Sequence, residues 1–173
     1  MSKNLKELLK ERPSDAEVGA LFHDMINDGA RGSILAGTSL IEDVLEGAIS
    51  HTFSHLSKNE LKELFEGTAP LSTFSAKIKI AYAIGVVGPM TRHDLEKLRE
   101  LSNAFAHSAR HLTFELPEIA SIVRSLNALK DVKGGEGYKV QHQFVESTTL
   151  LMWVLVGKMR TPVAKVQGID HLD

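Results

Sequence analysis

The stretch from residue 34 to residue 53, ILAGTSLIEDVLEGAISHTF, decides the fold class. Its apolar residues recur at intervals of three and four, the spacing at which side chains share one face of an α-helix. They are Ile34, Leu35, Ile41, Val44, Leu45, Ala48, Ile49 and Phe53. The stretch therefore predicts an amphipathic helix of about six turns that buries one face.

Helix-capping patterns mark where neighbouring helices begin. Ser14 with Glu17, and Ser57 with Glu60, match the capping box, in which each side chain bonds the main chain of the other. They predict a helix over residues 14–27 and a short helix that ends at Gly67.

Three further signals extend the pattern to the second half of the chain. Thr91 with Asp94 predicts a third cap, and Pro117 suits the first turn of a helix. The last helix is apolar on most faces in its second half, which indicates core or a dimer interface rather than a ligand pocket around Trp153. Helices are predicted from residue 74 to Gly85 or Gly88, and over residues 91–105, 117–129 and 140–159.

The sequence as a whole predicts one domain over residues 1–173, an all-α irregular bundle of about seven or eight helices. Patterns of alternating apolar and polar residues, typical of strands, are absent. Residues 130–138, which contain three glycines, predict a flexible loop, and residues 161–173 an irregular tail.

Composition excludes several classes of function. The net charge of −2 argues against a duplex-binding surface, and the absence of cysteine excludes disulfides and thiolate catalysis. The longest apolar run has seven residues, Leu150 to Val156, whereas a membrane span needs about 20. The first residues, MSKNLKELLKER, contain no secretory signal and predict a solvated, mildly amphipathic helix. We therefore expect a cytoplasmic protein without contact to a membrane.

Neither a cofactor nor a metal is expected. The glycines at 85, 88 and 134–137 follow no strand and lack the lysine of a phosphate-binding loop. His51 with His55, and His107 with His111, have the spacing of two ligands on one helix face, but the glutamate of the zinc-protease pattern is missing. Surface or capping histidines are the preferred interpretation.

Basic residues are interleaved with acidic ones, which indicates a mixed solvated surface rather than a track for phosphates. The basic residues are Lys77, Lys79, Arg92, Lys97, Arg99, Arg110 and Arg124, and the acidic ones are Glu96, Glu100 and Glu115.

The segment from residue 101 to residue 114, LSNAFAHSARHLTF, contains the candidate functional residues. Asn103 and His107 lie four residues apart and so share a helix face. One interpretation is that both bond helix ends and hold a buried turn. The other is a small polar site at a crevice of the bundle, formed by Ser102, Asn103, Phe105 and His107.

The same segment carries a family resemblance. NAFAH at 103–107 resembles the RNxFAH signature of the mannitol-operon repressor (MtlR-type) family. PLSTFSAKIKIAYAIG at 70–85 and IEDVLE at 41–46 are similar to further patterns of that family, so the resemblance covers about residues 30–115. It implies a compact all-α transcriptional regulator, a repressor of a sugar-alcohol operon. Such a protein would act through another regulatory protein of unknown identity, without direct DNA binding, and we expect a homodimer through the apolar last helix.

The signature also resembles the HEPN superfamily, helical domains with an Arg-Asn-x-x-x-His motif whose active members are metal-independent ribonucleases. This alternative needs a histidine for proton transfer and a cation for the charged phosphorane. Asn103 and His107 match, but Ser102 stands at the arginine position, and Arg99 or Arg110 would have to substitute. The departure favours a non-enzymatic protein. Within this alternative, the chain would be either a ribonuclease or an inactive relative that binds RNA or belongs to a toxin–antitoxin type of system.

Overall fold

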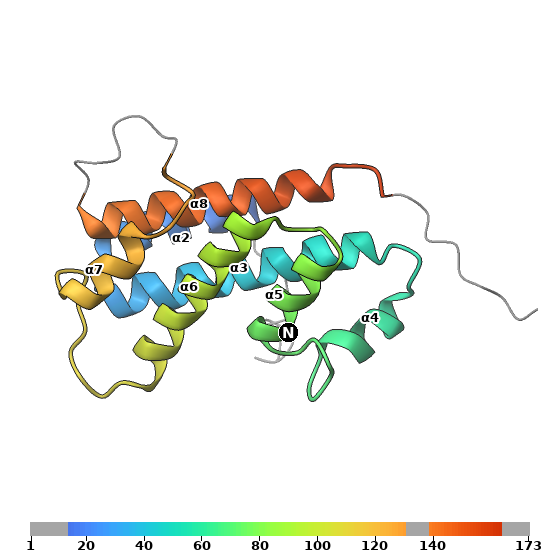
Figure 1. Cartoon of the computed structure of the whole chain (residues 1–173), viewed down its shortest axis with the longest axis horizontal. Helices are drawn as coiled ribbons and strands as arrows, with labels where there is room; N and C mark the ends of the chain where they lie inside the picture. The colour runs from blue at the N-terminus through green and yellow to red at the C-terminus, as the bar shows by residue number, and fades with distance from the viewer. Residues whose placement is uncertain (1–13, 131–138, 164–173) are drawn as a thin grey trace, which may run out of the picture.

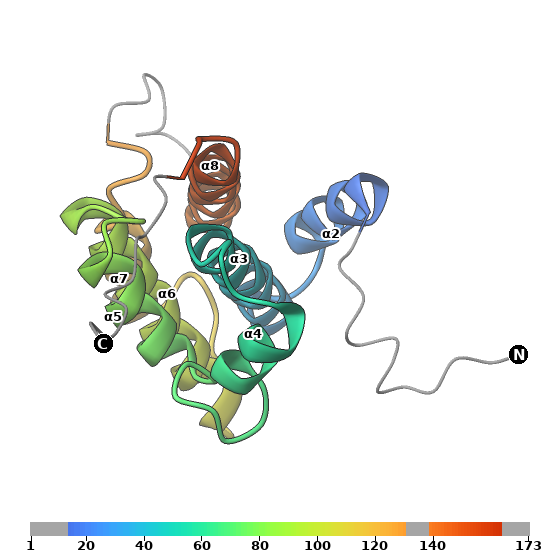
Figure 2. The same ribbon diagram turned by 90° about the vertical axis from the view of Figure 1, so that its right-hand side faces the viewer.

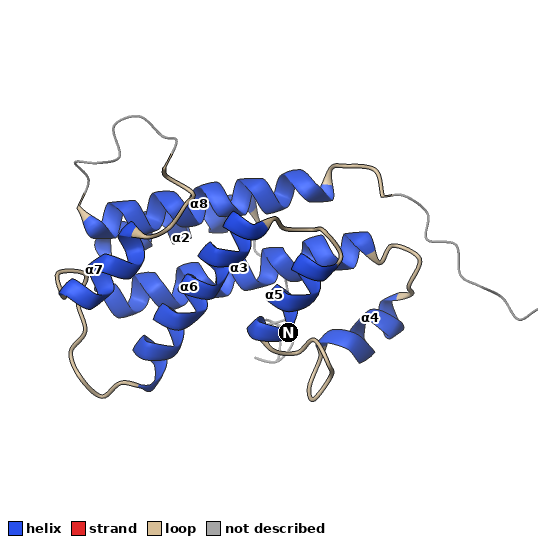
Figure 3. Cartoon of the chain, viewed as in Figure 1, coloured by secondary structure: helices blue, strands red, loops and turns tan. Residues whose placement is uncertain are grey.

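The computed structural model describes residues 14–130 and 139–163, which form one packed bundle (Figure 1). Over these ranges the chain has seven helices and no strand (Figure 3), which confirms the predicted all-α class. The predicted first helix, the loop at 131–138 and the tail from 164 lie outside the described residues. The helices are α2 (Asp15–Asn27), α3 (Ala30–Thr52), α4 (Lys58–Phe65), α5 (Phe74–Ala83), α6 (Pro89–His107), α7 (Pro117–Arg124) and α8 (Val140–Met159).

Most of the predicted helix starts are confirmed, and one is wrong. Both capping boxes form, at Ser14 and at Ser57, and Pro117 occupies the first turn of α7. The third cap fails because α6 begins at Pro89, whose fixed φ suits the first helical position and whose missing N–H costs nothing there. Asp94 therefore lies inside α6.

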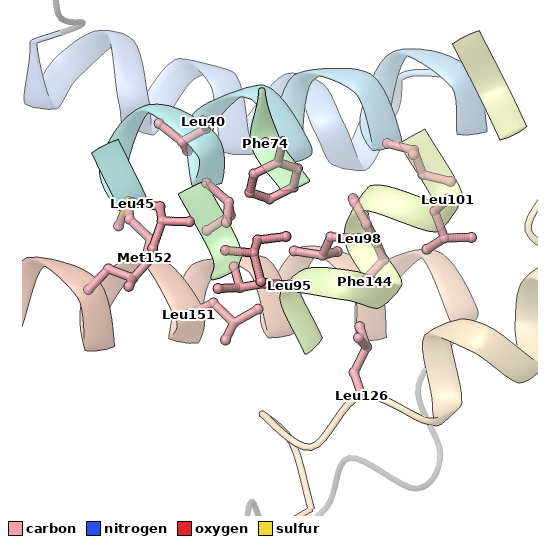
Figure 4. Close-up of a cluster of buried hydrophobic side chains, with 14 of the residues drawn as sticks. Leu40, Leu45, Phe74, Leu95, Leu98, Leu101, Leu126, Phe144, Leu151 and Met152 are labelled. Carbon is pink, nitrogen blue, oxygen red and sulfur yellow. The ribbon is translucent and has the colours of Figure 1, made fainter. Parts of the chain in front are cut away.

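Helix α3 lies at the centre of the bundle, with α8 along one side, α5 and α6 along a second and α2 along a third (Figures 1 and 2). Most of the face predicted for residues 34–53 is buried, with Ile34, Ile41, Leu45 and Ile49 all at 0% exposure. Leu35, Val44 and Phe53 of the same face are half-buried. Leucines of α6 and Phe144 of α8 meet it in a continuous apolar cluster (Figure 4).

Helix α8 is buried on one side only. Leu151, Met152 and Leu155 are buried, whereas Trp153 is 56% exposed and Val154 52% exposed. The prediction that this apolar run belongs to the core is therefore confirmed for Leu151, Met152 and Leu155, whereas Trp153 and Val154 are exposed. No helix within the described ranges has the length and apolar character that crossing a membrane requires.

The C-terminal end of α2 is fastened to α3 and α8. Gln141 Nε2 of α8 donates to the carbonyl oxygen of Met25 at 2.8 Å, and Ser33 Oγ of α3 donates to the same oxygen at 2.6 Å. Gly37 of α3 allows this close approach, since a Cβ there would lie 2.6 Å from Met25 Cε and 3.1 Å from Phe144 Cε1. The three helices therefore pack closely at this point.

Lys77 of α5 is buried, which corrects the prediction that it belongs to the solvated surface. Its Nζ lies 2.8 Å from Glu42 Oε1 and 2.9 Å from Glu46 Oε2, both on α3. Desolvation by burial lowers the pKa of Lys77, but the hydrogen bonds and charges of the two glutamates outweigh it, so the pKa is raised above its ordinary value. The ion pairs fasten α5 to α3.

Candidate functional site

The candidate residues lie in the last two turns of α6, and the helix separates them. Asn103 and His107 are both exposed and share one face, as predicted. Phe105 lies on the opposite side, fully buried in the core, and Ser102 is half-buried. Asn103 and His107 do not hold a buried turn, because their side chains are exposed. The end of α6 therefore exposes the amide of Asn103 and the imidazole of His107, while Phe105 packs the opposite side of the helix into the core.

Arg31 of α3 holds this end of α6 in place. Its Nη1 donates to the carbonyl oxygen of Phe105, and its Nη2 donates to that of Ser108 at 2.8 Å. The carbonyl oxygen of Arg110 lies 3.5 Å from the same nitrogen. The last carbonyls of a helix have no partner within the helix and carry partial negative charge. The guanidinium therefore satisfies and neutralises the end of the helix that carries Asn103 and His107.

Sequence reasoning missed Arg31, although the sequence carries a signal for it. Arg31 lies in the first turn of α3, where the helix dipole disfavours a cation, and that turn contains no acidic residue. A cation in such a place indicates a partner elsewhere in the fold. Here the partner is the end of α6, whose dipole favours a cation.

The two arginines expected to replace the cation of the ribonuclease motif are differently placed. Arg99 Nε bonds Glu96 Oε2 at 2.9 Å, one turn earlier on α6. Arg110 follows the helix with an exposed side chain, and its main-chain nitrogen bonds Ser108 Oγ at 3.1 Å. Arg31 is the arginine whose guanidinium contacts the main chain on both sides of His107, and its donors point at carbonyl oxygens.

The histidine pairs do not share helix faces, which corrects that part of the prediction. Helix α3 ends at Thr52, so His55 lies beyond the helix that contains His51. Helix α6 ends at His107, so His111 lies beyond that helix. His51 Nε2 instead lies 2.9 Å from the carbonyl oxygen of Thr161, beyond the end of α8. Among the residues that the structure describes, no three potential ligands gather around a metal position.

Comparison with known proteins identifies the family. A family model described as the mannitol repressor, MtlR, matches residues 26–153, which is more than half of the chain. The chain belongs to the mannitol repressor family. The resemblance seen in NAFAH is thereby confirmed, and the match extends from α2 into α8.

A solved structure of an MtlR protein shares this fold. The Escherichia coli MtlR in a structure of the MtlR–HPr complex matches with a TM-score of 0.62 and 19% sequence identity. The match covers 83% of this chain and 98% of that chain. No curated protein matches this chain.

A second feature of this MtlR-family chain is an apolar groove between α2, α3 and α8. It encloses about 520 Å³ and is lined by Val18 and Phe22 of α2, Val44 of α3, and Trp153 and Val156 of α8. Figure 2 shows α2 standing apart from α8 with α3 between and below them. The sequence analysis favoured core or a dimer interface over a pocket around Trp153, because the residues that line the groove also fit the pattern of a core-facing helix stripe.

Proposed function

We propose that this chain is a repressor of a sugar-alcohol operon that acts by binding another regulatory protein, HPr or a protein like it, rather than DNA. The observation that carries the proposal is the match to the mannitol repressor family over residues 26–153. The related Escherichia coli MtlR was solved in complex with HPr, which supports a partner of this kind for the present chain. Such a regulator would work in the cytoplasm, where the sequence predicts this chain to be.

The pairing of the basic residues supports protein contacts over DNA contacts. Lys77 is buried between two glutamates, Lys97 bonds Glu100, and Arg99 bonds Glu96. Arg31 donates to main-chain carbonyls. A surface that binds nucleic acid needs cations that are free to contact phosphates and so displace the counterions of the nucleic acid. These four cations already bond groups of the protein itself. The geometry also favours a regulator over a ribonuclease, which requires a cation held beside His107. Arg31 and Arg99 are engaged in hydrogen bonds, and Arg110 is exposed beyond the end of α6, off the helix face of Asn103 and His107.

We further propose that Asn103 and His107 contact the protein partner. Both are exposed on a helix end that Arg31 and Phe105 hold in place, so they can bind without first being ordered. Because the main chain at this helix end is already held, binding there loses less conformational entropy than binding to a flexible segment.

Titration calorimetry with purified HPr tests this proposal. We expect His107→Ala and Asn103→Ala each to weaken binding about tenfold, the effect of losing one contact at a binding hot spot. His93→Ala is the matched control, because His93 is exposed on the same helix near its other end. Loss in the control as well would exclude a local contact, and no binding by the unaltered chain would exclude HPr as the partner.

Absence of direct DNA binding is tested with a promoter fragment of a sugar-alcohol operon. We expect no retardation of the fragment at physiological salt. Retardation that weakens steeply as salt rises would contradict the proposal, because it indicates release of counterions from phosphates.

The expected homodimer would use the outer face of α8. Val154 is exposed there and does not line the apolar groove. Sedimentation velocity should give a dimer that Val154→Glu converts to a monomer. A monomer at every micromolar concentration of the unaltered chain would exclude this dimer.

A further inference from the structure

The end of α5 and the beginning of α6 form one exposed surface. The turn between the two helices is tight, since the main-chain nitrogens of Val86 and Val87 both donate to the carbonyl oxygen of Ala81. Large side chains project beside it, with Tyr82 at 40% exposure and Met90 at 53% exposure. This surface, the α5–α6 corner, is defined by Lys79, Tyr82, Met90 and Arg92. Aromatic residues, methionine and arginine are the residue types enriched at the centre of protein interfaces.

Arg92 of α6 is stacked on Tyr82 of α5. The central carbon of its guanidinium lies 4.6 Å from the centre of the tyrosine ring, a cation–π contact. Such a contact uses the flat face of the guanidinium and leaves the N–H donors along its edge. Within residues 14–130 and 139–163, the guanidinium of Arg92 donates no hydrogen bond and forms no ion pair. The group is therefore held in place while its donors remain available to a ligand.

The position of Arg92 in its helix also indicates a partner. Arg92 lies in the first turn of α6, which contains no acidic residue, and the helix dipole disfavours a cation there. Arg31 has the same kind of position in α3, and its guanidinium donates to carbonyl oxygens at the end of another helix. The described part of the chain offers Arg92 no such acceptor. Its acceptor would therefore come from another molecule.

The carboxylates of α6 do not compensate the charge of the corner. Glu96 is paired with Arg99, and Glu100 is paired with Lys97. The third carboxylate of the helix is buried and accepts from main-chain nitrogens beyond α7. Lys79, the second cation of the corner, is exposed and forms no ion pair among the described residues. The corner thus presents positive charge that complements the carboxylates of a partner.

A protein segment fits the corner better than a nucleic acid does. Base stacking needs an open aromatic face, and the guanidinium of Arg92 already covers one face of Tyr82. A backbone of phosphates is followed by a row of cations, whereas the corner contains two. The exposed thioether of Met90 suits an apolar side chain.

We propose that the α5–α6 corner binds an acidic segment of a protein partner, with its two cations facing carboxylates and its aromatic ring and thioether facing an apolar side chain. From Met90 to His107, α6 rises about 25 Å, so the corner and the surface of Asn103 and His107 are separate. The proposal therefore stands independently of HPr, and it does not involve Val154 of the expected dimer.

Fluorescence anisotropy with two labelled peptides tests the proposal. In the acidic peptide, glutamates flank a phenylalanine and a leucine, and in the neutral peptide glutamines replace the glutamates. We expect the full chain to bind the acidic peptide at least about tenfold more tightly, because the carboxylates face the cations of the corner. This preference should shrink as salt rises, since the charges are exposed.

Arg92→Gln should weaken binding of the acidic peptide about tenfold and leave the neutral peptide nearly unaffected. Arg124→Gln is the matched control, because it removes the same charge from an exposed arginine in the last turn of α7, where the helix dipole favours a cation. Met90→Gln should weaken binding of both peptides, because it removes the apolar contact that they share. Far-ultraviolet circular dichroism establishes that each variant is folded.

Several outcomes would overturn the proposal. Equal affinity for the two peptides, or no binding of the acidic peptide at low salt, would mean that the corner does not recognise carboxylates. Equal effects of Arg92→Gln and Arg124→Gln would mean that the peptide binds through overall charge. A single-stranded oligonucleotide that binds more tightly than the acidic peptide, and is lost in Arg92→Gln, would identify a nucleic acid as the occupant. A dimer that Arg92→Gln dissociates in sedimentation velocity would identify a second copy of the chain.

Discussion

Two cations fasten α3 to its neighbours, and they do so with different chemistry. Lys77 of α5 lies buried and is paired with the carboxylates of Glu42 and Glu46. Arg31 lies at the exposed start of α3 and donates to main-chain carbonyls at the end of α6. The first joint connects side chains of opposite charge, and the second connects a side chain with a helix end.

The difference between the joints predicts different roles. A buried charge that loses its partners is costly, so the Lys77 joint affects the stability of the whole bundle. The carbonyls at the exposed end of α6 would bond water if Arg31 were lost. The Arg31 joint therefore mainly fixes the position of one helix end, the one with Asn103 and His107.

Lys77→Met should give the largest loss of stability. We expect the free energy of unfolding to fall by about 2–4 kcal/mol, because two glutamates are left facing each other at a largely covered site. Their side chains keep 28% and 35% exposure, which allows some hydration and moderates the loss. Urea denaturation measures it. Lys79→Met is the control, since Lys79 is exposed and its replacement should change stability by less than about 0.5 kcal/mol.

Alkaline pH should separate the two joints. The folded-state pKa of Lys77 is raised, so its stabilising contribution is complete below the unfolded value of about 10.4 and is lost as pH rises through the folded value. The stability difference between the unaltered chain and Lys77→Met should therefore shrink above about pH 10.4. The carbonyl partners of Arg31 do not titrate, so the stability difference between the unaltered chain and an Arg31 variant should stay constant up to about pH 10.4. A difference that shrinks already below that pH would contradict this contrast.

Asp94→Ala should follow in size. The buried carboxylate accepts from the main-chain nitrogens of Asn127 and Ala128 at 2.8 and 2.9 Å, beyond the end of α7. Removing it leaves these donors without their acceptor, and we expect a loss of about 2 kcal/mol. Thermal unfolding measures it, with Glu100→Ala on the exposed side of α6 as the control. An unchanged melting temperature would show that water replaces the carboxylate.

Arg31→Gln should cost less, about 1–2 kcal/mol, because the carbonyls it leaves can be hydrated. The main effect is expected in hydrogen exchange, as faster exchange of the amides around Ser108. Arg31→Lys should recover only part of it, because lysine lacks the planar fork that bonds several oxygens. A loss as large as that of Lys77→Met would mean that the two joints do not differ in kind.

Ser57→Ala should give the smallest loss of stability, because it removes a cap within α4 and leaves the contacts between helices intact. A loss of about 0.5–1 kcal/mol is expected for the serine cap. Hydrogen bonds with the side chain and main chain of Ser57 hold the pKa of Glu60 below its ordinary value. The contribution of this capping box is therefore present above about pH 4.3 and is lost as pH falls through the lower, folded value. Ser54→Ala, at an exposed position before the helix, is the control for a denaturation series from pH 7 to pH 3.

The helices could be predicted from local signals, and their charged connections could not. The apolar spacing of residues 34–53 and the capping boxes at Ser14 and Ser57 are properties of neighbouring residues, and all are found in the structure. The interleaving of basic and acidic residues predicts a solvated Lys77. Its actual partners are 35 and 31 residues away in the sequence. Contacts at such separation leave no local pattern.

The candidate site shows the same division between local features, which could be predicted, and distant contacts, which could not. Helical spacing placed Asn103 and His107 on one exposed face. The same spacing turns Phe105, two residues along, to the other side, so a crevice containing all of them does not follow from it. Arg31 lies 74 residues before Phe105, and only its unfavourable place in the first turn of α3 hinted at a distant partner.

Gly37 sets how tightly the C-terminal end of α2 packs against α3 and α8. A Cβ at position 37 would lie 2.6 Å from Met25 Cε and 3.1 Å from Phe144 Cε1. The tip of the Met25 side chain can move aside, whereas the Phe144 ring is fully buried and has little room. A larger residue at position 37 is therefore accommodated only where the core around Met25 and Phe144 repacks.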